Sequence, residues 1–318
     1  MTPLATTDIE QALAPAPAAP IGLPRSIVVA TDGTNESDGA IEAAENLATR
    51  SSAVVRVVSV VEPAPPPPEW PPFVAFPPFD DPQHMLANQR ARVRTQLTRV
   101  LDLDKTWPIT MSAGAIGSEI ATFARDAGAD LIVAGRGKHG VVDRLLGEEH
   151  LTRLLRTTDV PVLAVDRSLS VPVSRVVIAT DFSAYSLYVA RIAATLISDD
   201  ATVYLVHVKP DPPFGVPHPG QWLRSYEGGV RAGLERLRTQ LSLPKTCTTE
   251  EVILNGHPGV MLAEFALATR SELIVVGVQG AGFWNHLVVG SVTSYLLREA
   301  PCSLLAVPVR EQAKEEAN

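Results

Sequence analysis

The sequence lacks the features that mark disulfide-rich, nucleic-acid-binding, membrane and secreted proteins. Its 318 residues include only two cysteines, too few for a disulfide framework and consistent with a reducing cytosol. The net charge of −8 lacks the basic excess that general nucleic-acid binding requires. No apolar run reaches the ~18 residues of a membrane span, and the N-terminus lacks the basic and apolar regions of a secretory signal. We therefore expect a cytoplasmic protein that binds neither nucleic acid nor a membrane.

The usual signatures of catalysis are also missing. The chain has no Gly-x-Ser-x-Gly elbow, no Cys/His metal cluster and no carboxylate pair with a recognisable spacing. We therefore expect no catalytic residue and no protein-built metal site.

What the sequence does contain is a regular alternation of short apolar runs and amphipathic segments, and 46% of its residues are hydrophobic. Such runs predict buried strands, and the amphipathic segments predict helices. This β-α alternation predicts an α/β fold with a doubly wound parallel sheet of five strands and helices on both faces. Strands are expected at 26–30, 53–61, 109–113, 131–134 and 162–165, and helices at 38–50, 83–101, 118–127 and 145–156.

The same pattern then occurs a second time. Val176–Asp181 repeats Ile27–Asp32, and residues 256–307 match 114–165 without a gap at an offset of 142 (277 − 135). We interpret this as duplication of a whole domain. The expected organisation is a disordered tail at 1–23, domains at 24–166 and 174–309 joined by a short linker, and a charged tail at 310–318. The proline-rich stretch 62–82 is interpreted as a surface excursion, with binding of an SH3-like partner as the alternative.

The second copy carries a glycine motif between a strand and a helix. The apolar run Leu273–Val276 ends at Gly277, and the spacing is Gly277-x2-Gly280-x9-Gly290-Ser291, followed by a helical segment from Val292 to Glu299. We expect the first two glycines to take positive φ and let the backbone approach a ligand. Backbone N–H groups, hydroxyls and the positive end of a helix dipole would favour a phosphate. The motif is neither a P-loop nor the dinucleotide fingerprint.

This spacing resembles the ATP-binding signature of the universal stress protein family, and the resemblance covers both copies. It implies that the last strands, Val162–Val165 and Leu304–Val307, pair across a pseudo-two-fold axis, so that the chain forms an intramolecular pseudo-dimer. Association of two chains into a homodimer is left open.

The resemblance also implies a site in the second copy. In nucleotide-binding members the matching aspartate contacts the adenosine end, the valine backs the adenine, and the glycines, serine and threonine hold ribose and phosphates. ATP would bring Mg²⁺ held partly by its phosphates. The implied residues are Ala179, Thr180, Asp181, Val208, Gly277, Gln279, Gly280, Gly290, Ser291, Val292 and Thr293. Ala179 and Gln279 depart from the proline and the basic residue or histidine that are usual in the family.

Simpler structural interpretations apply to several of these residues. Asp181 would serve as a helix N-cap, Gly277 and Gly290 as packing or turn glycines, and Val208 as part of the core. His207, next to Val208, is predicted to be a packed or interface histidine rather than a ligand. Phe283 and Trp284 would either cover a ligand or pack the loop onto the domain.

The first copy has lost the motif. In the ungapped alignment Gly280 becomes Lys138, Gly290 becomes Glu148 and Ser291 becomes Glu149. Two carboxylates at a helix N-terminus cap that helix favourably but repel a phosphate. We therefore predict that the first copy does not bind ATP. A metal site at Glu148, Glu149 and His150 is the alternative, although adjacent helical residues do not share a face.

The function implied is that of a nucleotide-binding regulatory protein of stress adaptation. Bound ATP would order the loop 279–289 and alter a surface recognised by an unknown protein partner. Two alternatives are a nucleotide-independent scaffold and a weak ATPase. A phosphoryl-accepting receiver domain is set aside, because neither copy shows its acidic cluster and lysine.

Overall fold

The computed structural model describes residues 22–62, 82–102, 105–137, 147–183, 185–209, 219–241, 243–279 and 289–308. In the N-terminal half, five strands alternate with helices in the predicted order. The strands are β1 (Ser26–Ala30), β2 (Val54–Val61), β3 (Ile109–Ala113), β4 (Leu131–Gly135) and β5 (Val162–Val165). The helices are the 3-10 turn η1 (Asn35–Ser37), α2 (Asp38–Ser51), α3 (Pro82–Val100), α4 (Ile116–Asp126) and α5 (Glu148–Thr157).

The C-terminal half repeats this arrangement. Its strands are β6 (Val173–Ala179), β7 (Ile197–Lys209), β8 (Thr248–Asn255), β9 (Leu273–Gly277) and β10 (Ser303–Val307). Its helices are α6 (Ser186–Ala194), α7 (Pro219–Leu241), α8 (Pro258–Thr269) and α9 (Ser291–Glu299). The proline-rich stretch lies, apart from its two end residues, outside the described residues, as do Gly280, Phe283 and Trp284.

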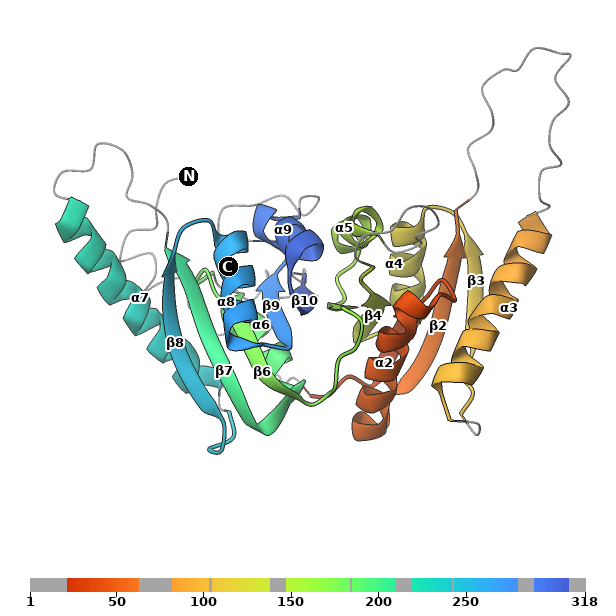
Figure 1. Ribbon diagram of the computed structural model, residues 1–318, viewed down its shortest axis with the longest axis horizontal. Helices are drawn as coiled ribbons and strands as arrows, with labels where there is room; N and C mark the ends of the chain where they lie inside the picture. Colours follow the sequence, from red (N-terminus) through yellow and green to blue (C-terminus); the bar gives the residue numbers. More distant parts are fainter. Residues whose placement is uncertain are drawn as a thin grey trace, which may run out of the picture.

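All ten strands form one sheet in the order β3-β2-β1-β4-β5-β10-β9-β6-β7-β8 (Figure 1). Neighbouring strands are parallel except at the centre, where β5 and β10 pair antiparallel. In that pair Leu163 lies opposite Leu305, and these two residues occupy equivalent positions in the two copies (305 − 163 = 142). The predicted pseudo-two-fold contact is confirmed, and its axis passes between these two leucines.

Helices cover both faces of the sheet, so its strands are apolar on both sides, as buried parallel strands require. Residues of α2, α3, α6 and α7 pack on one face, and residues of α4, α5, α8 and α9 pack on the other. Alternate residues of one strand pack into the two hydrophobic layers; Ile27, for example, lies in one layer and Val28 in the other. The segment between the halves is part of this core, because Leu169 and Val171 are buried.

A buried arginine crosses from the first half to the second. Arg136 follows β4 and is only 4% exposed. Its guanidinium donates to the carbonyls of Leu296 and Leu297 at 2.9 and 3.3 Å, and to those of Ala300 and Cys302 at 2.8 and 2.9 Å. These carbonyls lie in and just after the last turn of α9, where a cation also complements the helix dipole. Asp166 Oδ1 lies 3.6 Å away.

This contact predicts a large loss of stability for Arg136→Met. The variant keeps an unbranched side chain but leaves buried carbonyls without their donor, so the free energy of unfolding should fall by about 2–4 kcal/mol. Chemical denaturation measures this loss. Arg153→Met removes an exposed arginine from α5 and serves as the control. Equal stability of the two variants would contradict a role for Arg136 in joining the halves.

Candidate functional site

The ends of three strands meet at one edge of the C-terminal half. In the sheet order, β6 lies between β9 and β7, and the three strands are parallel. The chain leaves β6 toward β7 on one side, while β9 lies on the other, so the strand order reverses at β6. Ligands of open α/β sheets bind outside the carboxyl ends of strands at such a reversal. Ala179, Val208 and Gly277 stand at or next to these three strand ends.

The turn after β6 is held by the side chains of Thr180 and Asp181. The Thr180 hydroxyl accepts from the Phe182 N–H at 3.1 Å. Asp181 Oδ1 accepts from the Ser183 N–H at 3.0 Å and from the Ser186 hydroxyl at 3.2 Å. The N-cap position of α6 is Tyr185, so Asp181 is not the helix cap that the simpler interpretation of the sequence expects. Its half-buried carboxylate fixes the turn at the strand end.

His207 is a packed residue, as predicted. It is 7% exposed, its Nδ1 lies 2.8 Å from the Thr180 carbonyl, and its Nε2 lies 2.8 Å from the Tyr226 hydroxyl. A carbonyl can only accept, so Nδ1 donates, and Nε2 accepts from the Tyr226 O–H. The neutral ring thus joins the end of β6 to α7. Val208, the next residue, is half-buried near the end of β7 and packs with the hydrophobic layer on the opposite face of the sheet.

The base of the glycine loop is closed by backbone hydrogen bonds. Val278 donates to the Val307 carbonyl at 2.9 Å, and Gly290 donates to the Val278 carbonyl at 2.9 Å. A Cβ on Gly290 would lie 3.2 Å from that carbonyl oxygen, and one on Gly277 would lie 3.3 Å from the Gln279 carbonyl oxygen. Gly277 does not adopt positive φ, so that expectation is wrong. Its lack of a side chain leaves room for the neighbours that an added Cβ would approach, the Gln279 carbonyl and the Val189 side chain.

The first turn of α9 presents its N–H groups without a side-chain cap. Gly290 is the N-cap residue and has no side chain to accept from them. Ser291, the first helical residue, is exposed, and Val292 is half-buried. Thr293 is 1% exposed and donates its hydroxyl hydrogen to the Gly277 carbonyl at 3.1 Å, which ties the helix to the end of β9. The arrangement leaves hydrogen-bond donors and the positive end of a helix dipole at the strand edge.

In the N-terminal half the corresponding helix begins with acids. The N-cap of α5 is Gly147, and Glu148 and Glu149 occupy its first turn. Glu148 Oε1 lies 3.7 Å from a guanidinium nitrogen of Arg298, across the interface between the halves. Among the described residues no group of three or more His, Cys, Asp or Glu side chains is placed to hold a metal ion.

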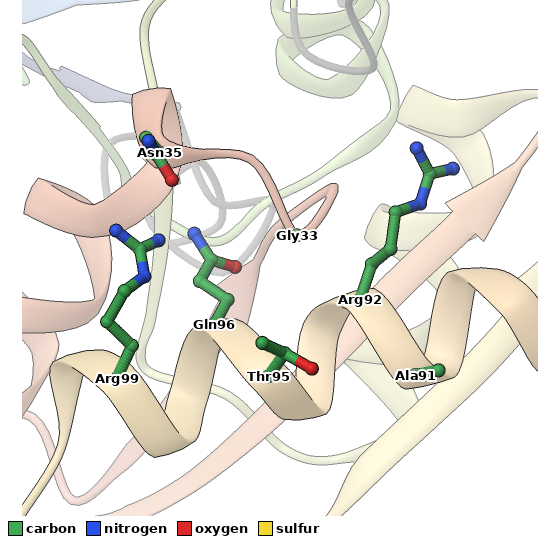
Figure 2. A pocket seen from close by; sticks show the side chains of 7 residues that line it. All are labelled: Gly33, Asn35, Ala91, Arg92, Thr95, Gln96 and Arg99. Carbon is green, nitrogen blue, oxygen red and sulfur yellow. The ribbon is translucent and has the colours of Figure 1, made fainter.

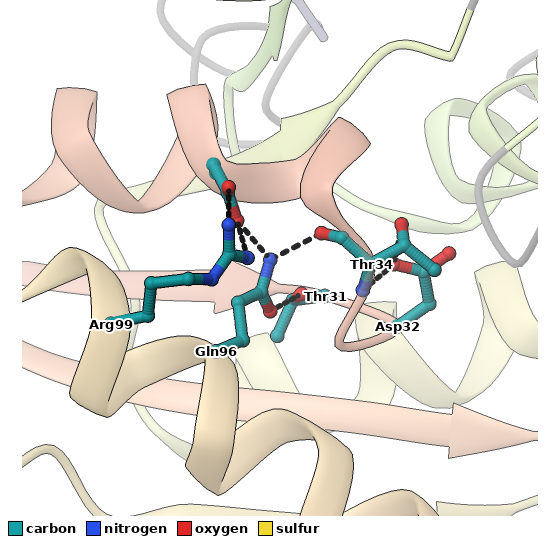
Figure 3. Close-up of polar contacts among 6 residues, drawn as sticks. Thr31, Asp32, Thr34, Gln96 and Arg99 are labelled. Carbon is teal, nitrogen blue, oxygen red and sulfur yellow. Dashed lines mark hydrogen bonds and ion pairs between the residues drawn. The ribbon is translucent and has the colours of Figure 1, made fainter.

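The turn after β1 repeats the turn after β6, but α3 packs against it differently. Asp32 Oδ1 accepts from the Thr34 N–H and from the Ser37 hydroxyl, both at 3.0 Å, as Asp181 does in the second copy. Gln96 accepts from the Thr31 hydroxyl at 2.6 Å and donates to the Thr34 carbonyl and to Asp38 (Figure 3).

A second glutamine of α3 takes the place of the histidine. Gln89 donates to the Asp32 carbonyl at 2.7 Å and to the Ser59 hydroxyl at 3.0 Å. Ser59 is the counterpart of His207. Sequence reasoning missed both glutamines, because an isolated glutamine in a predicted helix carries no signal of its own.

A shallow pocket of about 320 Å³ lies above this network, between α3 and the turn that carries Gly33 and Asn35 (Figure 2). Two arginines line it. The guanidinium of Arg99 is already paired with Asp38 at 2.8 Å, and that of Arg92 donates to Gln89 at 2.6 Å. The charge of Arg99 is therefore compensated by a carboxylate, whereas Arg92 is held only by a neutral amide.

The fold agrees with that of known proteins. The model of the universal stress protein family matches residues 24–166 and 172–308. The chain belongs to the universal stress protein family. Two tandem copies of the family fold thus form an intramolecular pseudo-dimer within one universal stress protein.

Individual relatives are more distant. A universal stress protein of Methanocaldococcus jannaschii is 31% identical over 137 residues, which make up 42% of this chain and 81% of that protein. One from Synechocystis is 30% identical over 88 residues, or 28% of this chain and 80% of that protein.

Solved structures share the fold over both halves. A Pseudomonas aeruginosa protein described as functionally unknown covers 92% of this chain and 96% of its own length, with a TM-score of 0.58 and 15% identity. A universal stress protein of Archaeoglobus fulgidus covers 89% of this chain and 98% of its own, with a TM-score of 0.55 and 17% identity. A universal stress protein in complex with cAMP matches 43% of this chain with a TM-score of 0.34, too distant a likeness to transfer its ligand.

Among the described residues of this universal stress protein, no helix has the length and apolar character needed to cross a bilayer.

The packing of His207 predicts a pH dependence of stability. Burial lowers the pKa of His207 below its usual value, although the Thr180 carbonyl and the nearby Asp181 oppose the shift. The unfolded chain takes up the proton first as the pH falls, so this contribution to stability is complete above about pH 6.5 and declines below it. His207→Asn keeps a donor for Thr180 but does not titrate. Denaturation between pH 8 and 5 should therefore show a shallower acid-side loss in the variant, and identical slopes would contradict the assignment.

Proposed function

We propose that this universal stress protein binds an adenine nucleotide, ATP, in its C-terminal half and serves a regulatory role in stress adaptation. The observation that carries the proposal is the first turn of α9, which follows the N-cap Gly290, has neither a side-chain cap nor an acidic residue, and lies beside the closed loop base after β9. An N-terminus of this kind favours a polyphosphate, because unpaired N–H groups and the helix dipole act on the same charge.

The neighbouring strand ends support an adenosine on the same side. In this proposal Ala179, Thr180 and Asp181 frame the adenosine end, and half-buried Val208 backs the adenine. Ser291, Val292 and Thr293 would hold the phosphates together with Gly277, Gln279, Gly280 and Gly290. Gly280 lies outside the described residues. A bound triphosphate would bring Mg²⁺ coordinated partly by its own oxygens.

The proposal predicts that Gly290→Glu abolishes nucleotide binding. The new Cβ crowds the Val278 carbonyl oxygen, and the carboxylate places a negative charge where the phosphates would lie. Native and denaturing mass spectrometry of the purified protein should find adenine nucleotide with the wild type and none with the variant. Gly147→Glu makes the same substitution at the N-cap of α5 and is the matched control. Retention of nucleotide by Gly290→Glu, or its loss from Gly147→Glu, would contradict the site.

A converse prediction concerns the N-terminal half. There, Glu148 and Glu149 would repel a phosphate from the first turn of α5. Like unit charges at ~4 Å cost about 1 kcal/mol in water and about 4 kcal/mol at an effective dielectric near 20. Glu148→Gly with Glu149→Ser, made in the Gly290→Glu background, should therefore create a site that calorimetry detects. An isotherm no different from that of Gly290→Glu alone would count against this explanation.

A further inference from the structure

The helices α5 and α9 lie side by side at the centre of the molecule (Figure 1). They occupy the same face of the sheet, and the pseudo-two-fold axis between Leu163 and Leu305 relates them. Their sequences correspond at an offset of 142, so buried Leu154 and Leu155 match buried Leu296 and Leu297. The two-fold axis makes the two helices antiparallel, so the last turn of each helix approaches the first turn of the other.

One side of this arrangement contains an ion pair. Arg298, in the last turn of α9, lies 3.7 Å from Glu148, in the first turn of α5. The arginine of one half thus approaches the helix N-terminus of the other half, the end at which a phosphate would bind if the acids were absent.

The pseudo-two-fold rotation that exchanges the two halves places Arg156 at the position of Arg298 and Gly290 at the position of Glu148 (298 − 156 = 142; 290 − 148 = 142). Arg156 is exposed in the last turn of α5. Within the described ranges its side chain makes no hydrogen bond or ion pair. Gly290 has no side chain to serve as its partner, so the carboxylate that pairs with Arg298 has no equivalent beside Arg156.

We propose that Arg156 of the N-terminal half binds the phosphate chain of the nucleotide held in the C-terminal half. The phosphate would take the place that the Glu148 carboxylate occupies beside Arg298. Arginine suits this role because its planar donors match phosphate oxygens and its charge persists at all physiological pH values. The N-terminal half then contributes a ligand to its neighbour's site. This inference rests on the function proposed above.

The test compares the affinities of adenosine, AMP and ATP for the wild type and for Arg156→Gln. Calorimetry should show about tenfold weaker ATP binding to the variant and less than a twofold change for adenosine. The ATP effect should shrink as salt is raised, because an exposed contact is screened. Arg156→Lys should recover part of the affinity. Arg153→Gln removes an equal charge one turn earlier on the exposed side of α5 and should bind ATP like the wild type.

The outcomes separate this inference from the function on which it rests. If the wild type binds no adenine nucleotide, both the proposed function and the role of Arg156 are overturned. Suppose that the wild type binds ATP, that Gly290→Glu does not, and that Arg156→Gln binds ATP as tightly as Arg153→Gln. This result overturns the role of Arg156 alone. Equal losses for adenosine and ATP in Arg156→Gln also overturn it, because a purely structural effect would not depend on the phosphates. Thermal unfolding without nucleotide should be the same for Arg156→Gln and Arg153→Gln.

Discussion

The antiparallel pairing of β5 with β10 is the constraint on which the rest of the molecule depends. It joins two five-stranded sheets at strands that would otherwise be open edges, and it removes those edges from solvent. Because Leu163 faces its own counterpart, Leu305, the pairing also imposes two-fold symmetry on everything that packs above it. Helices α5 and α9 are thereby brought together, and Arg136 can reach the carboxyl end of α9 from the other half. A defect at this seam would affect both halves.

The chain uses this symmetric frame asymmetrically. Both halves build the same aspartate turn after their first strand, at Asp32 and at Asp181. In the N-terminal half the glutamines of α3 fill the neighbouring space, and acids begin α5. In the C-terminal half a neutral histidine and a tyrosine hold the turn, and the first turn of α9 carries no acidic residue. The order of the strands is the same in the two halves, whereas the side chains at the strand ends differ.

Much of the fold could be predicted, because it follows from local patterns. Apolar runs located the strands, the repeat at a fixed offset predicted two copies of one domain, and the family resemblance implied the pairing of β5 with β10. The contacts of Gln89, Gln96 and Arg136 were not predictable, since each depends on where a distant segment packs. Arg136 occupies the position equivalent to Val278, and sequence alone does not tell that it points across the interface. Of the site, the strand ends, the start of a helix near Ser291 and the packed His207 were anticipated, whereas the absence of a side-chain cap on α9 was not. The conformation of Gly277 was not anticipated either, because this glycine is still the last residue of β9 rather than part of the turn.

The central claim is that only the C-terminal copy holds a nucleotide, and photoaffinity labelling tests it most directly. The full chain would be irradiated with 8-azido-ATP at a concentration that saturates binding, with excess ATP as competitor, and the labelled peptides would be mapped by mass spectrometry. The account predicts competitor-sensitive label confined to peptides that contain the ends of β6, β7 and β9 or the start of α9. Competitor-sensitive label in peptides carrying the ends of β1, β2 or β4, with the C-terminal peptides unlabelled, would contradict it.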